Sequence, residues 1–159
     1  MAIPERDLLL IRRTIELARL ARSRGNHPFG ALLAFDDTII LEAGNTVGTG
    51  HNPTHHAELN LVQRAFAELR PEVICRTTLY TSTEPCPMCT GAIFWAGIRK
   101  LVFSVAATRL GSLTGDTFCR SSRLLFDNAH EQTVVIGPVL EEEGLEVHQG
   151  FWTNTTSRP

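Results

Sequence analysis

The sequence predicts an α/β fold in which a mixed sheet is sandwiched between helices. Two observations support this: a hairpin of two strands in the first third of the chain, and an alternation of helices with strands after it. The chain has 159 residues, of which 43% are hydrophobic and 20% charged, and these values are ordinary for one compact globular domain. Because no internal repeat or Pro/Gly/Ser-rich linker divides it, we expect a single domain over residues 1–159.

The first element is expected to be a helix over about residues 5–23. Pro4 suits the position before the first turn, and Gly25 suits the end of a helix. Between them, apolar residues recur at the spacing of one helical face, at Leu8, Ile11, Ile15 and Ala18. This face should pack against the sheet.

Two strands and a second helix should follow. "GALLAF" (30–35) and "TIILEAG" (38–44) have the composition of strands and are separated by two aspartates, which predicts a hairpin. A loop rich in Gly, Asn, Thr and Pro then leads to a helix over about residues 55–69, which should end before Pro71.

The next two strands enclose a short helix. "TTLYTST" (77–83) and "RKLVFSV" (99–105) are rich in β-branched and aromatic residues, which favour strands. Between them, "EPCPMCTGAIFWAG" predicts a turn and a short helix that ends at Gly97.

The last third of the chain is less regular. We expect a loop containing Gly111 and Gly115, a short helix over about residues 122–128, and a final strand in "TVVIG". "PVLEEEGLEVHQGFW" (138–152) predicts a terminal helix, whose aromatic end either closes over a pocket or packs the helix onto the sheet.

Charge and hydropathy limit the partners. The formal net charge is −2, Lys100 is the only lysine, and acidic residues cluster in "EEEGLE" near the C-terminus, so no polyanionic partner is indicated. No apolar run approaches the ~20 residues of a membrane span. The first twenty residues mix acids and arginines with leucines, unlike the apolar core of a signal peptide. We therefore expect a cytoplasmic protein without membrane or nucleic-acid partners.

A C-x-x-C pair, Cys86 and Cys89, opens the predicted helix after the third strand. Their spacing puts both sulfurs on one helical face, and the positive helix N-terminus favours thiolates. Two thiolates supply half of a zinc site, but the chain has no second C-x-x-C pair to complete a four-cysteine structural site. The pattern therefore favours a catalytic site, which has three protein ligands and an open position.

The stretch "HNPTHHAELN" offers three histidines as the third ligand, followed by Glu58. A catalytic zinc site needs a nearby carboxylate that moves protons without binding the metal. From the first turn of the predicted helix, His56 and Glu58 can both reach the site. With "PCPMC" they match the H-x-E…P-C-x-x-C signature of zinc-dependent deaminases, whereas His55 would give H-x-x-E. We therefore expect His56, Cys86 and Cys89 to bind one Zn²⁺ and Glu58 to be catalytic.

With these motifs in place, the chain resembles the cytidine deaminase-like superfamily, and within it the branch of guanine deaminases and tRNA adenosine deaminases. Four blocks carry the resemblance in the right order: "HPFGALL", "EAGNTV", "PTHHAELN" and "LYTSTEPCPMCTGAIFWAGIRKLVFSV". The resemblance fades after Val105. It implies a three-layer α/β/α fold around a mixed five-stranded sheet, one Zn²⁺ per chain held by one histidine and two cysteines, and a homodimer.

The resemblance also implies a reaction. Glu58 takes a proton from a zinc-bound water, and the resulting hydroxide attacks the ring carbon that carries an amino group. Glu58 then returns protons to the ring nitrogen and to the leaving amine, and ammonia departs. Backbone N–H groups near Ala57 and Cys86 are candidates to hold the developing negative charge.

Four further residues are candidate contacts to the substrate. Asn45 matches an asparagine that bonds the base in this family, with a turn asparagine bonding its own loop as the alternative. Phe29 either stacks on the substrate or joins the core. Trp95 belongs to the pocket rim, to a dimer interface or to the substrate contacts. Asp116 resembles by position an acidic residue that assists proton transfer in guanine deaminases, with an ordinary loop aspartate as the alternative.

The expected function is hydrolytic deamination of a nucleobase or nucleoside, with guanine as the best single guess because "EPCPMC" and "FWAG" resemble guanine deaminases. The stretch "GSLTGDTFCRSSRLLF" does not match them closely, so another aminated purine, cytosine or a triazine stays open. A tRNA-specific adenosine deaminase is an alternative, against which the negative charge and the acidic "EEEGLE" stretch argue. A structural zinc-binding module without activity is a third hypothesis, and it would have no use for Glu58.

Overall fold

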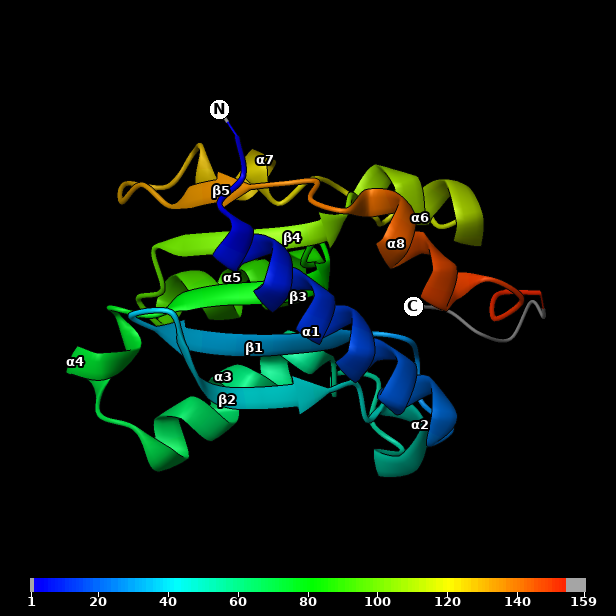
Figure 1. Cartoon of the computed structure of the whole chain (residues 1–159), viewed down its shortest axis with the longest axis horizontal. Helices are drawn as coiled ribbons and strands as arrows, with labels where there is room; N and C mark the ends of the chain where they lie inside the picture. Colours follow the sequence, from blue (N-terminus) through cyan, green and yellow to red (C-terminus); the bar gives the residue numbers. More distant parts are fainter. Residues whose placement is uncertain (1, 154–159) are drawn as a thin grey trace.

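The computed structural model describes residues 2–153, built around a five-stranded sheet in the order β2-β1-β3-β4-β5 (Figure 1). β1 pairs antiparallel with both β2 and β3, whereas β3, β4 and β5 run parallel. This confirms the expected mixed sheet. The strands are β1 (Gly30–Phe35), β2 (Thr38–Gly44), β3 (Thr78–Thr83), β4 (Lys100–Val105) and β5 (Val134–Ile136).

Helices cover both faces of the sheet, which gives the expected three layers (Figure 1). One face carries α1 (Glu5–Ser23) and α8 (Glu141–Leu145), and the other carries α3 (Ala57–Glu68) and α5 (Pro87–Trp95). Successive side chains of a strand point to opposite faces, so each strand serves two cores. The core under α1 includes Leu32, Tyr80 and Val102, and the core under α3 and α5 includes Leu33, Leu79 and Leu101.

The first helix lies unusually close to the sheet. α1 has the predicted bounds, with Pro4 before its first turn and Gly25 past its end at a φ of +86°. A Cβ atom added to Gly30 would lie 2.5 Å from the Leu17 Cβ and from the Thr14 carbonyl oxygen. Only glycine lets the start of β1 approach α1 this closely.

The prediction that Gly111 lies in a loop was wrong, because it lies inside α6 (Ala107–Thr114). This helix is only 8 residues long, has no side-chain cap at Ala106 and carries a glycine in its interior, so the sequence gives no start signal and a residue that disfavours helix. The glycine is used for close approach instead: an added Cβ would lie 3.0 Å from the Asp116 carbonyl oxygen and 3.2 Å from the Cys119 Cβ. The returning chain packs directly across α6, and the expected short helix follows as α7 (Arg123–Phe126).

The predicted terminal helix over 138–152 was too long. α8 begins only at Glu141, because Leu140 takes a left-handed conformation with a φ of +53°. A short 3-10 helix, η1 (Glu146–His148), continues it, and Gly150 turns the chain at a φ of +68°. Two single-turn helices, α2 (Val47–Gly50) and α4 (Pro71–Ile74), were also not predicted. Among the helices of residues 2–153, none has the length and apolarity required to cross a membrane.

Candidate metal centre and active site

Two helix N-termini converge beside the end of β3. His56 is the residue before the first turn of α3, and Cys86 holds the same position at α5, with Cys89 in the first turn of that helix. α3 and α5 pack against each other, so their two partially positive N-termini point into one region. Glu58 lies in the first turn of α3. The two motifs, about thirty residues apart in the chain, therefore meet because each opens a helix of the same layer.

The three expected ligands lie together. The ligating atoms of His56, Cys86 and Cys89 are all within 4.8 Å of one another, and the Cys86 Sγ lies 3.5 Å from the His56 Nδ1. Zinc bonds of about 2.3 Å to sulfur and 2.0–2.1 Å to nitrogen, at tetrahedral angles, place these two atoms about 3.6 Å apart. In the described part of the chain, this is the one cluster of His, Cys, Asp and Glu side chains with metal-ligand geometry. The donor set and its spacing fit zinc.

The charge state of Cys86 also fits a metal site. The pKa of Cys86 is lowered to about 4, chiefly by the hydrogen bond from the Cys89 thiol, with further contributions from His56 and the Cys89 backbone N–H. The pKa of Cys89 is raised in return by the same pairing and by burial. Cys86 is therefore a thiolate at neutral pH, which is the form that binds zinc.

Glu58 is placed for proton transfer. It is 5% exposed and accepts a hydrogen bond of 2.8 Å on Oε1 from the Thr81 hydroxyl, so Oε2 is left for a proton or a substrate. Burial raises the pKa of Glu58, against the opposing effects of His56 and Thr81. A carboxylate with a raised pKa accepts a proton more readily near neutral pH, as a general base must.

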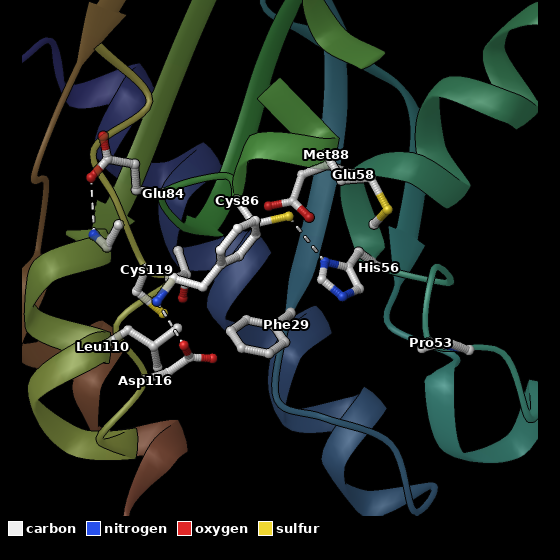
Figure 2. A pocket seen from close by; sticks show the side chains of 13 residues that line it. Phe29, Pro53, His56, Glu58, Glu84, Cys86, Met88, Leu110, Asp116 and Cys119 are labelled. Atoms are coloured by element: carbon white, nitrogen blue, oxygen red, sulfur yellow. Dashed lines mark hydrogen bonds between the residues drawn. The ribbon is translucent and has the colours of Figure 1, made fainter. Parts of the chain in front are cut away.

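The metal cluster forms one end of a cavity of about 220 Å³ (Figure 2). Its wall contains three acidic side chains and no lysine or arginine. α6 and the segment after it form the side opposite His56, and Phe29 lies between these two sides (Figure 2). The lining residues are Phe29, Pro53, His56, Glu58, Thr83, Glu84, Cys86, Met88, Ala107, Leu110, Asp116, Phe118 and Cys119.

Glu84 holds the far wall of this cavity in place. Its Oε1 accepts hydrogen bonds from the Ser121 hydroxyl at 2.9 Å and from both the backbone N–H and the hydroxyl of Ser122 at 2.8 Å. Its Oε2 accepts the backbone N–H of Ala107, at 2.9 Å, at the start of α6. One buried carboxylate thus joins the residue before the C-x-x-C motif to both ends of the irregular segment.

The predicted substrate contacts fall into two groups. Phe29 and Asp116 line the cavity, and Ala57 is the first residue of α3, fully buried beside the metal ligands. Asn45 is buried next to this region: its Oδ1 accepts the Val47 N–H at 3.0 Å, as a turn asparagine would, but its Nδ2 has no partner among the described residues.

The structure does not bring Trp95 to the cavity. This residue ends α5 and is 81% exposed, on the outside of the molecule. The two other histidines of "HNPTHHAELN" also lie apart from the metal cluster. His51 is exposed at the end of α2, and His55 packs against Gly50.

Sequence reasoning missed several residues of the cavity wall. Thr83 has a detectable signal, because it lies two residues after Thr81 on the strand that leads into the C-x-x-C motif, and alternation puts both on one face. Phe118 and Cys119 have no such signal in the sequence, because they follow α6, a helix that was not predicted. Burial, then Asp116 and Cys86, raise the pKa of Cys119 to about 11, so this thiol stays neutral.

A family model for the cytidine and deoxycytidylate deaminase zinc-binding region matches residues 4–105, which include all three metal-cluster residues and Glu58. The chain belongs to this family. It is therefore a deaminase of the zinc-binding type, a hydrolase of C–N bonds, as the motifs predicted.

Its relatives cover more than one substrate class. The chain is 39% identical over 156 residues to a probable cytosine deaminase of Schizosaccharomyces pombe, and the match spans 94% of both chains. It is 42% identical over 81 residues to the guanine deaminase of Bacillus subtilis, spanning 51% of this chain and 52% of the relative. It is 31% identical over 146 residues to a tRNA-specific adenosine deaminase of Buchnera aphidicola, spanning 92% of this chain and 88% of the relative.

A solved structure of guanine deaminase from Nitrosomonas europaea has the same fold. It superposes with a TM-score of 0.74 over 92% of this chain and 83% of the other, at 22% sequence identity. The likeness supports the three-layer architecture.

Proposed function

We propose that this protein is a zinc-dependent hydrolytic deaminase of a free nucleobase, with cytosine and guanine as the two candidate substrates. The observation that supports it is the composition of one small cavity: His56, Cys86, Cys89 and Glu58 at one end, and the carboxylate of Asp116 at another. The reaction exchanges a ring C–NH₂ group for C=O, consuming one water and releasing ammonia.

In this proposal, His56, Cys86 and Cys89 hold one Zn²⁺ per chain. When bound, the metal supplies a water of lowered pKa and stabilises negative charge. Glu58 takes up one proton of the water on Oε2, because Oε1 is already occupied by the Thr81 hydroxyl, and passes it to the ring nitrogen. The second proton, from the hydroxyl added to the ring carbon, passes through the same carboxylate to the leaving amine. Burial, which raises the pKa of Glu58, makes the uptake of a proton by this carboxylate easier.

The acidic wall of the cavity supports a free base over a larger substrate. Asp116 accepts the Phe118 backbone N–H at 2.7 Å on Oδ1, and its other oxygen points across the cavity towards Phe29 (Figure 2). This oxygen suits a ring N–H, which a free base has and a nucleoside replaces with its sugar. A cavity without lysine or arginine, in a chain of net charge −2, also disfavours an RNA backbone. We propose base binding for Phe29, Asn45 and the backbone N–H of Ala57.

The two candidate substrates, cytosine and guanine, are each supported by sequence similarity to a different relative. The probable cytosine deaminase matches along 94% of the chain, so the match includes the segment around residues 107–119 that forms the far wall of the cavity. The guanine deaminase is slightly more similar but over only half of the chain. Because the match to the probable cytosine deaminase includes the far wall of the cavity, we place cytosine first and guanine second.

We also propose a homodimer. Trp95 on α5 and Leu124 and Leu125 on α7 are exposed, and these two helices pack against each other, so they offer apolar surface on one side of the molecule. Light scattering would give twice the chain mass for the protein and a lower mass for Trp95→Arg. A monomeric mass for the unmodified protein would refute this part of the proposal.

Ammonia release by the zinc-loaded protein tests the substrate. The panel contains cytosine, guanine, cytidine, guanosine, adenine, a small aminotriazine and an anticodon stem-loop RNA. We expect turnover of cytosine or guanine, and at least tenfold lower kcat/KM for the matching nucleoside. Turnover of the stem-loop alone would replace this proposal with the tRNA alternative.

A further inference from the structure

The cavity wall contains a hydroxyl whose direction is set by two residues outside it. Thr83 ends β3, is 2% exposed and lines the cavity. It lies two residues after Thr81, whose hydroxyl donates to Glu58, and β-strand alternation points both side chains to the same face. Among residues 2–153, the Thr83 Oγ1 has a polar contact with the Nε2 of His148, at 3.5 Å.

His148 approaches from the opposite layer and is almost fully buried. It lies in η1, is 3% exposed, and packs on Phe29 with ring centroids 5.5 Å apart. The Trp152 ring lies nearly parallel to the His148 ring, at an interplanar angle of 21°, and its centroid is 6.0 Å from those of both His148 and Phe29. The indole Nε1 donates a hydrogen bond of 3.1 Å to the His148 Nδ1. Burial, with the charge of Arg22, lowers the pKa of His148 to about 4, so the ring is neutral at pH 7.

These contacts leave His148 one tautomer. An indole nitrogen can only donate, so the Nδ1 that faces Trp152 must accept and carries no proton. A neutral imidazole carries one N–H, which must then be on Nε2. That N–H faces the Thr83 Oγ1, which therefore accepts. The Thr83 hydroxyl hydrogen is therefore not used in the contact with His148. Because Thr83 lines the cavity, this hydrogen can be directed into the cavity.

We propose that Thr83 donates a hydrogen bond to the substrate, and that Trp152 and His148 are positioning residues that fix this direction. The substrate then presents an acceptor to Thr83, either a ring carbonyl oxygen or an unprotonated ring nitrogen. Asp116 accepts a hydrogen bond from the substrate, and Thr83 donates one to it. The two residues therefore recognise a donor and an acceptor of the ring, respectively. This inference rests on the proposed function, because it requires a heterocycle in the cavity.

Two measurements test it. The first is the ¹⁵N spectrum of the histidine rings in the full-length zinc-loaded protein, in which His148 is assigned by comparison with His148→Gln. We expect an unprotonated Nδ1 and a protonated Nε2 in the unmodified protein, and a mixture of tautomers in Trp152→Phe, which keeps the ring but removes its N–H. A protonated Nδ1 in the unmodified protein would overturn the proposal, and this readout does not depend on turnover.

The second measurement separates KM from kcat on the base that is turned over. Loss of one neutral hydrogen bond predicts a roughly tenfold lower kcat/KM for Thr83→Val, mostly through KM, and no more than about a twofold change for Thr83→Ser, which keeps the hydroxyl. Trp152→Phe should fall between them. Equal kcat/KM for Thr83→Val and the unmodified protein would overturn the role of Thr83. Failure of the unmodified protein to turn over any base, with the Nε2–H tautomer present, would refute the proposed function while supporting the predicted direction of the hydroxyl.

Discussion

Replacing Glu84 by glutamine should destabilise the protein strongly although it changes only one non-hydrogen atom. Three donors converge on Oε1 and one backbone N–H on Oε2. An amide has a single oxygen, so its NH₂ group must face either the Ala107 N–H or the donors of Ser121 and Ser122. A buried donor left without an acceptor costs about 1–3 kcal/mol, and loss of the negative charge weakens the bonds that remain. Together these effects predict a loss of roughly 2–4 kcal/mol.

Thermal and urea unfolding of the zinc-loaded proteins measure this loss. For a chain of this size, each kcal/mol corresponds to roughly 2–4 °C in Tm, so Glu84→Gln should melt about 5–15 °C lower. Glu143→Gln is the matched control, because Glu143 forms a surface ion pair with Arg12, and exposed pairs contribute only about 0–1 kcal/mol. If Glu84→Gln and Glu143→Gln unfolded at the same urea concentration, the assigned role of Glu84 would be refuted.

Two further predictions concern the metal cluster and His148. Cys89→Ser should hold well under one zinc per chain by elemental analysis, whereas Cys75→Ser, which changes an exposed cysteine, should keep the full content; equal zinc in both would contradict the assigned ligand set. The folded-state pKa of His148, about 4, lies below the 6.5 of an ordinary histidine side chain, so the unfolded chain binds a proton that the folded chain does not, and stability should fall as the pH drops from about 6.5 towards 4. Urea unfolding at pH 7 and pH 5 should show about 2 kcal/mol more loss for the unmodified protein than for His148→Gln, and equal losses would contradict the buried neutral histidine.

The sequence predicted most of the fold because its elements carry strong local signals. The bounds of the first helix and of the hairpin strands were correct, since Pro4 and Gly25 flank a regular apolar stripe and two aspartates separate the strands. The proximity of His56, Cys86 and Cys89 could also be anticipated. Each motif lies at the start of a helix, and the partial positive charge of a helix N-terminus favours anionic groups such as thiolates and carboxylates.

The far wall of the cavity could not be predicted, for a physical reason. Between residues 106 and 122 the chain is held by a carboxylate from another element, Glu84, and by the close approach at Gly111, and neither leaves an apolar period in the sequence. The tautomer of His148 likewise depends on Trp152 and Thr83, which lie on opposite sides of its ring. The far wall of the cavity and the tautomer of His148 therefore depend on tertiary contacts.

The most direct test of the account is ammonia release by Glu58→Gln measured together with its zinc content. The variant keeps the size and polarity of the side chain but cannot accept a proton, and general acid–base catalysis typically contributes about 10²–10⁴-fold. We expect one zinc per chain, as in the unmodified protein, and a kcat at least about a hundredfold lower on the base that is turned over. A variant that kept its zinc and deaminated at nearly the original rate would show that Glu58 does not transfer the proton, and the proposed chemistry would have to be abandoned.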